Sequence, residues 1–394
     1  MLLLSAEFSS GETIPYPDFN GDGYADLAIG SPSEDVGTTA EDAGAVNVIY
    51  GSASGLSATA AKADQVWSQA SGGINDEPQA GDMFGTSLAA GDFNGDGYSD
   101  LAIGVPGEDN DAGAAAVIYG SSEGLKSSAG GDGTGRSDQL WSQSSSGIED
   151  SSEADDSFGQ SLVAGDFNGD GYDDLAIGVP GESVTGISAG GASVIYGSSS
   201  GLSASAARAD QLVTQAGSDN ESGDLFGWSL VAGDFDNDGR DDLAIGAPGE
   251  DAGGITDSGV VHVLPGSAAG LVADAASREI FAQGAGGIED TAEAGDEFAS
   301  SLAAGDFNGD GYDDLAVGAP LQDIVNAGDN AGAVNVIYGS SVGLSASAAG
   351  DGTGRGDQYW HQFDPSETPA SSQADVVIQH PAAQLDDQYG SSLA

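Results

Sequence analysis

A nine-residue acidic segment returns five times along the chain, each time followed directly by a short apolar run. It places Asp or Asn at positions 1, 3, 5 and 9 and Gly at position 6, and the run that follows is Leu-Ala-Ile-Gly or Leu-Ala-Val-Gly. The copies begin 68 to 74 residues apart, which is too long for a helical solenoid and suits one multi-stranded sheet per repeat. The copies are DFNGDGYAD from Asp18, DFNGDGYSD from Asp92, DFNGDGYDD from Asp166, DFDNDGRDD from Asp234 and DFNGDGYDD from Asp306.

Each repeat reads as four short strands. In the second copy the small residues of 84–93 predict a strand that enters the acidic loop, and the apolar run 101–106 predicts a second strand that Pro-Gly ends. Residues 114–120 and 138–143 predict a third and a fourth strand, each bounded by turn residues. Four antiparallel strands per repeat form one blade of a β-propeller, so we expect an all-β fold.

The same residues resemble the FG-GAP repeat of the integrin α-subunit N-terminal propeller and its bacterial relatives. The Phe-Gly half stands at Phe84-Gly85, and the Gly-Ala-Pro half at Gly246-Ala247-Pro248. The resemblance covers essentially the whole chain. It implies a ring of blades in which the acidic loop joins the first two strands of each blade. Family propellers usually have seven blades, whereas five acidic loops are present here.

The repeat boundaries predict a single propeller domain over residues 1–394, with two alternatives for its ends. The last residues resemble a first strand, so they could complete blade one and close a five-bladed ring. Alternatively, the chain is a fragment of a longer propeller. The expected blades are 1–70 together with 386–394, 80–143, 155–215, 223–283 and 295–362, with 363–385 as a connecting loop.

The acidic loops predict calcium sites, about five ions in all, one per loop. Ca²⁺ takes six to eight oxygen ligands, and Gly at position 6 permits the sharp bend that turns successive donors inward. The backbone carbonyl at position 7 is expected between the side-chain donors. The predicted side-chain ligands are Asp18, Asn20, Asp22, Asp26, Asp92, Asn94, Asp96, Asp100, Asp166, Asn168, Asp170, Asp174, Asp234, Asp236, Asp238, Asp242, Asp306, Asn308, Asp310 and Asp314, with carbonyls from Tyr24, Tyr98, Tyr172, Arg240 and Tyr312.

A plain hairpin turn is the alternative interpretation, because Asn-Gly and Asp-Gly favour such turns. A turn has no need of Asp at position 9, which all five copies carry. Two carboxylates 4 Å apart also repel by about 4 kcal/mol at an effective dielectric constant of 20, so the clustered acids favour a bound cation. Mg²⁺ is less suited, since it keeps several waters and needs a regular octahedron.

The overall charge limits the partners. The 64 acidic and 7 basic residues give a formal charge of −57, which repels nucleic acid and anionic membranes. The chain has no cysteine, so disulfides and thiolate sites are excluded, and no apolar run is long enough to insert in a membrane. We expect an extracellular or cell-surface location, although no targeting signal is present in the sequence. The sequence does not indicate an oligomeric state.

Function is predicted from the scaffold rather than from a catalytic motif. The three histidines fall in unlike contexts, and no nucleophile–base pair stands out, so the chain is not expected to be an enzyme. The favoured hypothesis is a non-catalytic adhesion or ligand-binding propeller. A protein or glycan would bind the loop face opposite the calcium loops, where the resemblance places ligands. One alternative is a calcium-dependent enzyme acting on polysaccharide or phospholipid, or its accessory domain. Another is a structural segment of a larger surface adhesin.

Overall fold

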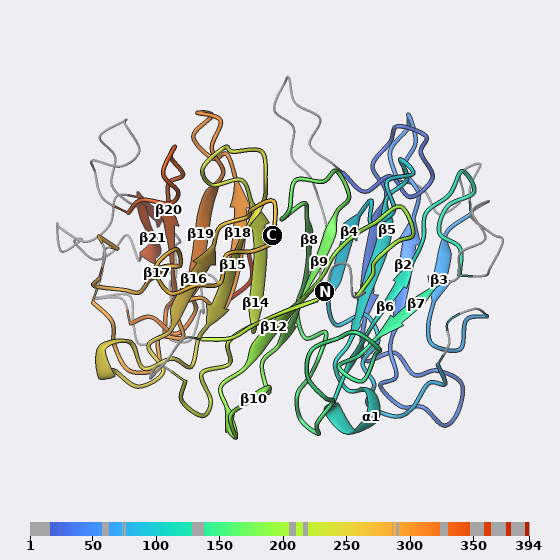
Figure 1. Ribbon diagram of the computed structural model, residues 1–394, viewed down its shortest axis with the longest axis horizontal. Helices are drawn as coiled ribbons and strands as arrows, with labels where there is room; N and C mark the ends of the chain where they lie inside the picture. The colour runs from blue at the N-terminus through green and yellow to red at the C-terminus, as the bar shows by residue number, and fades with distance from the viewer. Residues whose placement is uncertain are drawn as a thin grey trace.

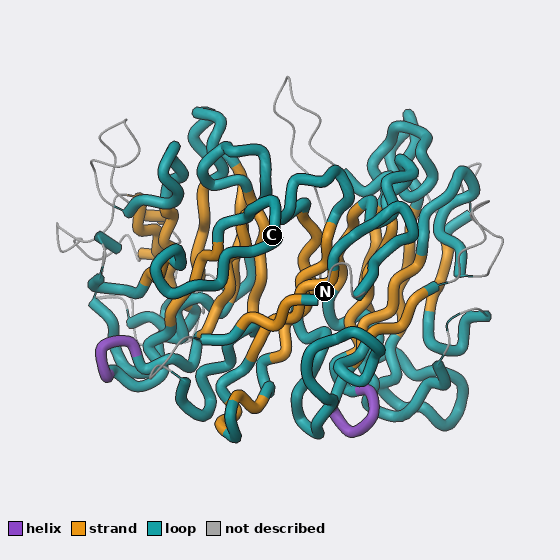
Figure 2. Tube along the Cα trace, in the orientation of Figure 1, coloured by secondary structure: helices purple, strands orange, loops and turns teal. Residues whose placement is uncertain are grey.

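Strands account for nearly all the regular structure of the computed structural model. Two short helical segments, α1 (Glu108–Asp111) and η2 (Ala252–Gly254), are the exceptions within the described residues (Figure 2). None of the described helices is long and apolar enough to cross a membrane. The structure describes residues 16–56, 63–72, 74, 76–127, 138–204, 210–215, 220–285, 287–288, 291–323, 330–346, 358–363, 376–379 and 391–393.

The strands form one sheet per repeat and pair in chain order within it (Figure 1). All these neighbours are antiparallel except the last two strands of the fifth sheet, which are parallel. A separate hairpin, β10 (Ser183–Val184) with β11 (Ile187–Ser188), projects from the third sheet's connecting segment. The strands are β1 (Leu27–Ser31), β2 (Ala45–Ile49) and β3 (Gln65–Trp67) in blade one; β4 (Leu88–Gly91), β5 (Asp100–Val105), β6 (Ala114–Ile118) and β7 (Gln139–Trp141) in blade two; β8 (Leu162–Gly165), β9 (Asp174–Val179), β12 (Gly191–Ile195) and β13 (Gln211–Val213) in blade three; β14 (Ser229–Gly233), β15 (Asp242–Ala247), β16 (Val260–Leu264) and β17 (Glu279–Phe281) in blade four; and β18 (Ser301–Gly305), β19 (Asp314–Ala319), β20 (Ala333–Ile337), β21 (Gln358–Phe363) and β22 (Val376–Gln379) in blade five.

Successive sheets pack through their first strands, which is the arrangement of a β-propeller. Strand β4 contacts β8, β8 contacts β14, and β14 contacts β18. These strands lie near the middle of Figure 1, while the fourth strands β3 and β21 lie toward its sides. The predicted all-β propeller of four-stranded blades is therefore confirmed, with the first strand of blade one outside the described residues.

The Phe-Gly segment differs from its expected role as the start of a blade's own first strand. Strand β4 begins only at Leu88, and Phe84 instead forms a parallel bridge with Gly44 of the preceding blade. The Phe84 amide donates to the Ala43 carbonyl at 2.9 Å, and the ring is fully buried. The segment therefore joins two blades, and the repetition of this bridge at Phe158 and Phe226 makes it a general feature of the fold.

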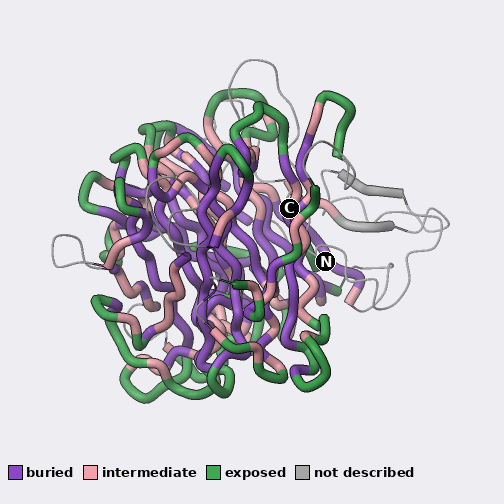
Figure 3. Tube along the Cα trace, turned by 90° about the vertical axis from the view of Figure 1, so that its right-hand side faces the viewer, coloured by how far each residue is buried: buried purple, intermediate pink, exposed green. Residues whose placement is uncertain are grey.

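The core lies between the blades, where apolar side chains of neighbouring sheets pack together. In Figure 3 the buried residues follow the strands inside the molecule, and the exposed residues gather in the outer loops. Second strands such as β5 and β9 are buried along their whole length, which explains their continuous apolar sequence. The aromatic residue at position 2 of the acidic loop is fully buried in blades one to four, yet Phe307 in blade five is 53% exposed. The far side of blade five is therefore not covered by a further blade within the described residues.

The two ends of the chain differ in part from the expected boundaries. Strand β22 pairs in parallel with β21 and lies within residues 363–385, where a connecting loop was expected. Residues 386–390, which begin the segment expected to complete blade one, lie outside the described residues. Ser391 to Leu393 are described and form no strand. Ring closure therefore stays a prediction.

Candidate metal centre

In blades two to five each acidic loop connects the first and second strands, and all five loops fold around the carboxylate at position 1. In blade two, Asp92 accepts hydrogen bonds from the amides of Asp96 at 3.0 Å and Gly97 at 2.8 Å. Gly97 has a φ of +87°, a left-handed conformation that other residues rarely adopt. The Tyr98 amide in turn donates to Asp96 Oδ1 at 3.2 Å. The loop is therefore a tight bend that brings positions 1 and 5 together.

The carboxylate at position 9 is buried and holds the loop to the body of its blade. Asp100 accepts from the amides of Phe93, inside the loop, and Gly120, after the third strand. Its counterparts accept from the matching glycine amide in every blade: Asp26 from Gly51, Asp174 from Gly197, Asp242 from Gly266 and Asp314 from Gly339, at 2.8 to 2.9 Å. An invariant Asp at position 9 thus has a structural task, whether or not it also binds an ion.

Burial raises the pKa of every position 9 carboxyl group. The pKa of Asp174 rises to about 8, that of Asp26 and that of Asp242 to about 7, and that of Asp314 to about 6. The pKa of Asp100 also lies well above its usual range. Desolvation is the largest cause in each case, and the neighbouring loop aspartates add to it. A nearby divalent cation would act in the opposite direction and favour the ionised form.

The amide at position 3 tests whether the loop suits a cation. The Oδ1 atoms of Asn94 and Asn168 are buried and have no hydrogen-bond partner within the described chain, although both side chains are at most 4% exposed. Their Nδ2 groups donate to the position 9 carboxylates Asp100 and Asp174. Buried acceptors normally have a partner, so an unpartnered oxygen beside carboxylates fits a hard cation such as Ca²⁺. In the first loop the unpartnered atom is Nδ2 of Asn20, so that amide is turned the other way.

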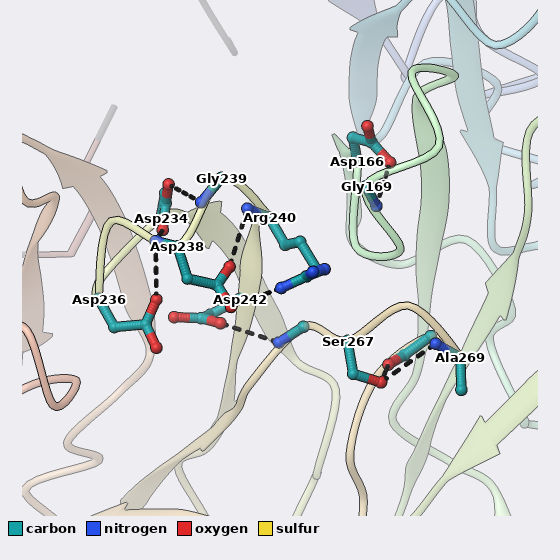
Figure 4. A network of polar contacts seen from close by, with 12 residues as sticks. Asp166, Gly169, Asp234, Asp236, Asp238, Gly239, Arg240, Asp242, Ser267 and Ala269 are labelled. Carbon is teal, nitrogen blue, oxygen red and sulfur yellow. Dashed lines mark hydrogen bonds and ion pairs between the residues drawn. The ribbon is translucent and has the colours of Figure 1, made fainter.

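The fourth loop gathers its carboxylates most closely (Figure 4). Oxygens of Asp234, Asp236 and Asp238 all lie within 4.8 Å of one another. Arg240 stands at position 7 in place of tyrosine, and its Nη1 lies 2.6 Å from Asp238 Oδ2. Burial and the neighbouring Asp238 raise the pKa of Asp236. An all-oxygen set of this kind can bind a hard divalent cation, and Arg240 offsets one of its charges.

Position 8, which carries no role in the sequence prediction, links each loop to the one before it. Asp173 Oδ2 accepts from the Asp92 amide at 2.7 Å, while the Asp173 amide donates to the Asp92 carbonyl at 3.2 Å. The same link joins Asp241 to Asp166 and Asp313 to Asp234, and Ser99 to Asp18 through its hydroxyl. The doubled Asp-Asp at positions 8 and 9 of three loops was the signal in the sequence.

Position 7 also reaches the preceding loop, through its side chain. The ring of Tyr98 covers Gly21 so closely that a Cβ there would lie 2.6 Å from Tyr98 Cε1, and Tyr172 covers Gly95 in the same way. The loops thus form a connected row along one edge of the propeller. The structure brings positions 1, 3, 5 and 9 of every loop into one short bend, and their roles as ligands, like that of the position 7 carbonyl, stay predictions.

Comparison with known proteins agrees with this geometry. The fold and its repeated acidic loops define a β-propeller repeat protein. The chain belongs to the FG-GAP repeat family, whose repeat matches residues 15–49, 84–118, 158–196, 226–264 and 298–337. This confirms the resemblance drawn from the Phe-Gly and Gly-Ala-Pro segments.

Relatives of known name share the repeats over part of their length. Integrin alpha pat-2 of Caenorhabditis briggsae is 37% identical over 211 residues, which are 51% of this chain and 16% of that protein. The phosphatidylinositol-glycan-specific phospholipase D of Bos taurus is 32% identical over 175 residues, 43% of this chain and 19% of that protein. This chain thus spans less than a fifth of either relative. Among solved structures, the rhamnogalacturonan lyase YesW aligns with 87% of this chain and 70% of its own at 12% identity, with a TM-score of 0.37.

Proposed function

We propose that this chain is a calcium-stabilised, non-catalytic extracellular propeller that presents loops to a protein or glycan partner. One observation carries the calcium part of the proposal: buried amide oxygens at Asn94 and Asn168 lack partners beside clustered carboxylates. In each loop, positions 1, 3, 5 and 9 and the position 7 carbonyl would hold one Ca²⁺. The ion would supply positive charge that neutralises the aspartates and closes the bend.

An extracellular location fits the physical character of these loops. They lie at the surface, and positions 4 to 6 of the loops are mostly exposed. Open calcium sites of this kind in extracellular modules bind with dissociation constants of about 10⁻⁴ to 10⁻³ M, which suits surroundings rich in calcium. The similarity to integrin alpha subunits supports the same location and a role in adhesion.

The ligand would bind at the loops opposite the calcium loops. On that side the connections after the second strands include α1 and the β10–β11 hairpin, and their sequences differ from blade to blade. Variable loops on a rigid sheet scaffold are where binding sites usually lie. The exposed indole of Trp228, which follows the Phe226-Gly227 segment, adds an apolar contact surface in blade four.

A second candidate function is that of an accessory domain in a phospholipase-like enzyme. The similarity to phosphatidylinositol-glycan-specific phospholipase D favours it, because the repeats of this chain align with part of that protein. The chain would then support catalysis by another domain rather than carry it.

Binding to arrays of glycans and matrix proteins, with and without CaCl₂, tests the proposal. We expect binding that EGTA abolishes and that CaCl₂ restores, with no turnover of the bound partner. Cleavage of a bound polysaccharide or lipid by the purified chain would overturn the non-catalytic assignment. Binding that is indifferent to EGTA, together with an unchanged melting temperature, would overturn the calcium assignment.

A further inference from the structure

A second set of carboxylates lies at the junctions between blades, at the end of each second strand away from the acidic loop. In the first junction, Gln69 follows the last strand of blade one, and Glu108 follows β5 of blade two. Asp76 comes from the segment between the blades, and Asp82 precedes Phe84. The corresponding residues of the second junction are Gln143, Asp150, Asp156 and Glu182, and those of the third are Gln215, Asp224 and Glu250.

In the first junction one amide group holds two carboxylates together. Gln69 Nε2 donates to Glu108 Oε2 at 2.6 Å and to Asp76 Oδ2 at 3.2 Å. The other oxygen of Glu108 accepts from the side-chain Nε2 of Gln79 at 3.2 Å, and the backbone amide of Gln79 donates to Asp82 Oδ2. Glu108 is 6% exposed and Asp82 1%, so these acids are largely withdrawn from water.

The arrangement repeats at the next two junctions. Gln143 donates to Glu182, and the neighbouring Asp150 helps to raise the pKa of Glu182. Gln215 Nε2 donates to Glu250 Oε2 at 2.6 Å, and Glu250 contacts the buried Asp224. Three independent copies of one constellation, contributed each time by two neighbouring blades, indicate a built feature rather than a chance meeting of surface acids.

The glutamine oxygens provide a separate sign of a missing ligand. The Oε1 atoms of Gln69, Gln143 and Gln215 are buried and have no hydrogen-bond partner within the described chain, and the three side chains are at most 3% exposed. The Nε2 groups of the same side chains donate to the glutamate carboxylates. If the side-chain amide rotated by half a turn, Oε1 would take the place of Nε2 and face the carboxylate oxygens. Two such oxygens repel each other unless a cation or a proton lies between them.

Charge compensation at the junctions is also incomplete. Within the described residues, no ion pair involves Glu108 or Glu182. Burying two adjacent carboxylates without a cation or a proton is strongly unfavourable. Desolvation, together with the nearby aspartates, raises the pKa of Glu108 and that of Glu182 to about 8.

We propose that each of these three junctions binds a divalent cation of the Ca²⁺ class, in addition to the acidic loops. The donors are all oxygens, from the glutamine amide, the glutamate and one or two aspartates, which is the set that hard cations prefer. Because the donors come from two blades, each ion ties neighbouring blades together at the face where the loops vary. The proposal does not depend on calcium in the acidic loops.

The fourth junction offers a natural comparison. There Gln322 replaces the glutamate, and Gln283 Nε2 donates to its Oε1 at 2.5 Å. Asp296 is retained and is 2% exposed. Gln283 Oε1 also lacks a hydrogen-bond partner within the described residues, so this junction differs from the other three in the charge of one ligand. A neutral amide replaces the glutamate there, so the junction should bind Ca²⁺ weakly or not at all, since affinity falls with the number of charged ligands.

Counting bound ions by equilibrium dialysis against CaCl₂ followed by elemental analysis tests the proposal. We expect Glu108→Gln, Glu182→Gln and Glu250→Gln each to remove one ion, and Gln322→Glu to add one. The first three substitutions should also raise the melting temperature of the calcium-free protein, because they remove repulsion between buried acids. Gln322→Glu keeps the test decisive even if another variant fails to fold.

Unchanged ion counts in all four variants would overturn the proposal and leave a shared proton as the compensation at these junctions. Asp96→Asn and Asp170→Asn separate this result from the acidic-loop sites. If the loops bind no calcium, those two variants leave the ion count unchanged, while the junction variants still lower it.

Discussion

The third and fourth blades solve the same electrostatic problem with different residues. The third loop, DFNGDGYDD, carries four aspartates, whereas the fourth, DFDNDGRDD, carries five aspartates and one arginine. The additional carboxylate is Asp236, and the compensating charge is Arg240, which contacts Asp238 at 2.6 Å. The formal charge of the two loops is therefore equal. The difference teaches that residue types at positions 3, 4 and 7 can change while the formal charge of the loop is kept.

The same substitutions change how one loop contacts the next. Tyr172 covers Gly95 of the second loop, while the aliphatic part of Arg240 covers Gly169 of the third. Arg240 thus performs two tasks that Tyr172 performs only in part: it covers the preceding loop and neutralises an acid in its own.

Calcium binding by the two loops gives the largest expected effect. If the third and fourth loops bind calcium alike because their formal charges are equal, Asp170→Ala and Asp238→Ala should each remove one Ca²⁺ and lower the melting temperature by a similar amount. With a dissociation constant of about 10⁻⁴ M, CaCl₂ at about 20 mM stabilises the folded state by about 3 kcal/mol per site, so each variant should lose about 3 kcal/mol. Calorimetric titration and thermal melting in CaCl₂ measure both quantities.

The control is Ser200→Ala, at an exposed position outside the loops. In excess EGTA all three proteins should melt close to the calcium-free wild type. A full calcium response in Asp238→Ala, beside a lost response in Asp170→Ala, would show that Arg240 replaces the ion in the fourth loop and would break the comparison.

Acid stability gives the second largest effect, because the fourth blade has a buried histidine, His262, in its core. His262 lies on β16 opposite Ile245, where the third blade has Ser193 opposite Ile177. Its ring packs edge-on against Phe226, with the centroids 5.2 Å apart, and Arg278 lies nearby. Burial, with a smaller contribution from Arg278, lowers the pKa of His262 to about 3.

The unfolded chain therefore binds a proton at this histidine between about pH 6.5 and pH 3 and the folded chain does not, so stability falls as the pH is lowered through this range. His262→Asn, which copies Asn335 of blade five, should remove this loss. Relative to the variant, the free energy of unfolding of the wild type should fall by about 1.4 kcal/mol for each pH unit below pH 6.5. Urea unfolding at pH 7 and pH 4.5 measures the difference. Parallel pH profiles for the two proteins would contradict it.

The sequence predicted what is local and missed what passes between blades. The apolar second strands and the bend at position 6 follow from patterns within nine to fifteen residues, and the structure confirms both, while the ligand roles of the loop residues stay predictions. The pairing of Phe84 with Gly44, the link from Asp173 to Asp92 and the contact of Gln69 with Glu108 join residues about 40 to 80 positions apart. Such contacts depend on how blades stack, which a repeat pattern does not specify. Doubled acids at position 8 and glutamines after the fourth strand were visible but had no local explanation.

A double-mutant cycle on the fourth loop gives a smaller effect and tests charge compensation directly. Arg240→Tyr alone leaves the extra carboxylate uncompensated and should lower stability by about 1 kcal/mol at low salt. The side chains of Arg240 and Asp238 are 32% and 40% exposed, so solvent screening limits the value. Asp236→Asn with Arg240→Tyr recreates positions 3 and 7 and the formal charge of the third loop, and should restore wild-type stability to within about 0.5 kcal/mol.

Salt provides the control for this cycle. At 1 M NaCl the screening length falls to about 3 Å, so the loss in Arg240→Tyr should largely disappear. A loss that persists at high salt would assign it to the packing of the arginine stem on Gly169 rather than to charge.

Backbone strain at position 4 gives the smallest expected effect and sharpens the comparison last. Asn237 has a φ of +53°, whereas Gly169 occupies the equivalent place with a φ of +70°. Asparagine tolerates the left-handed region better than most residues but less well than glycine. Asn237→Gly should therefore raise stability by about 0.5 kcal/mol, in thermal melts with saturating CaCl₂. Gly169→Asn should lower it by more, because a Cβ there would lie 3.1 Å from Arg240 Cγ. If neither substitution changes stability, the backbone at position 4 is not strained in either loop. The stability difference between the two loops would then come from positions 3 and 7.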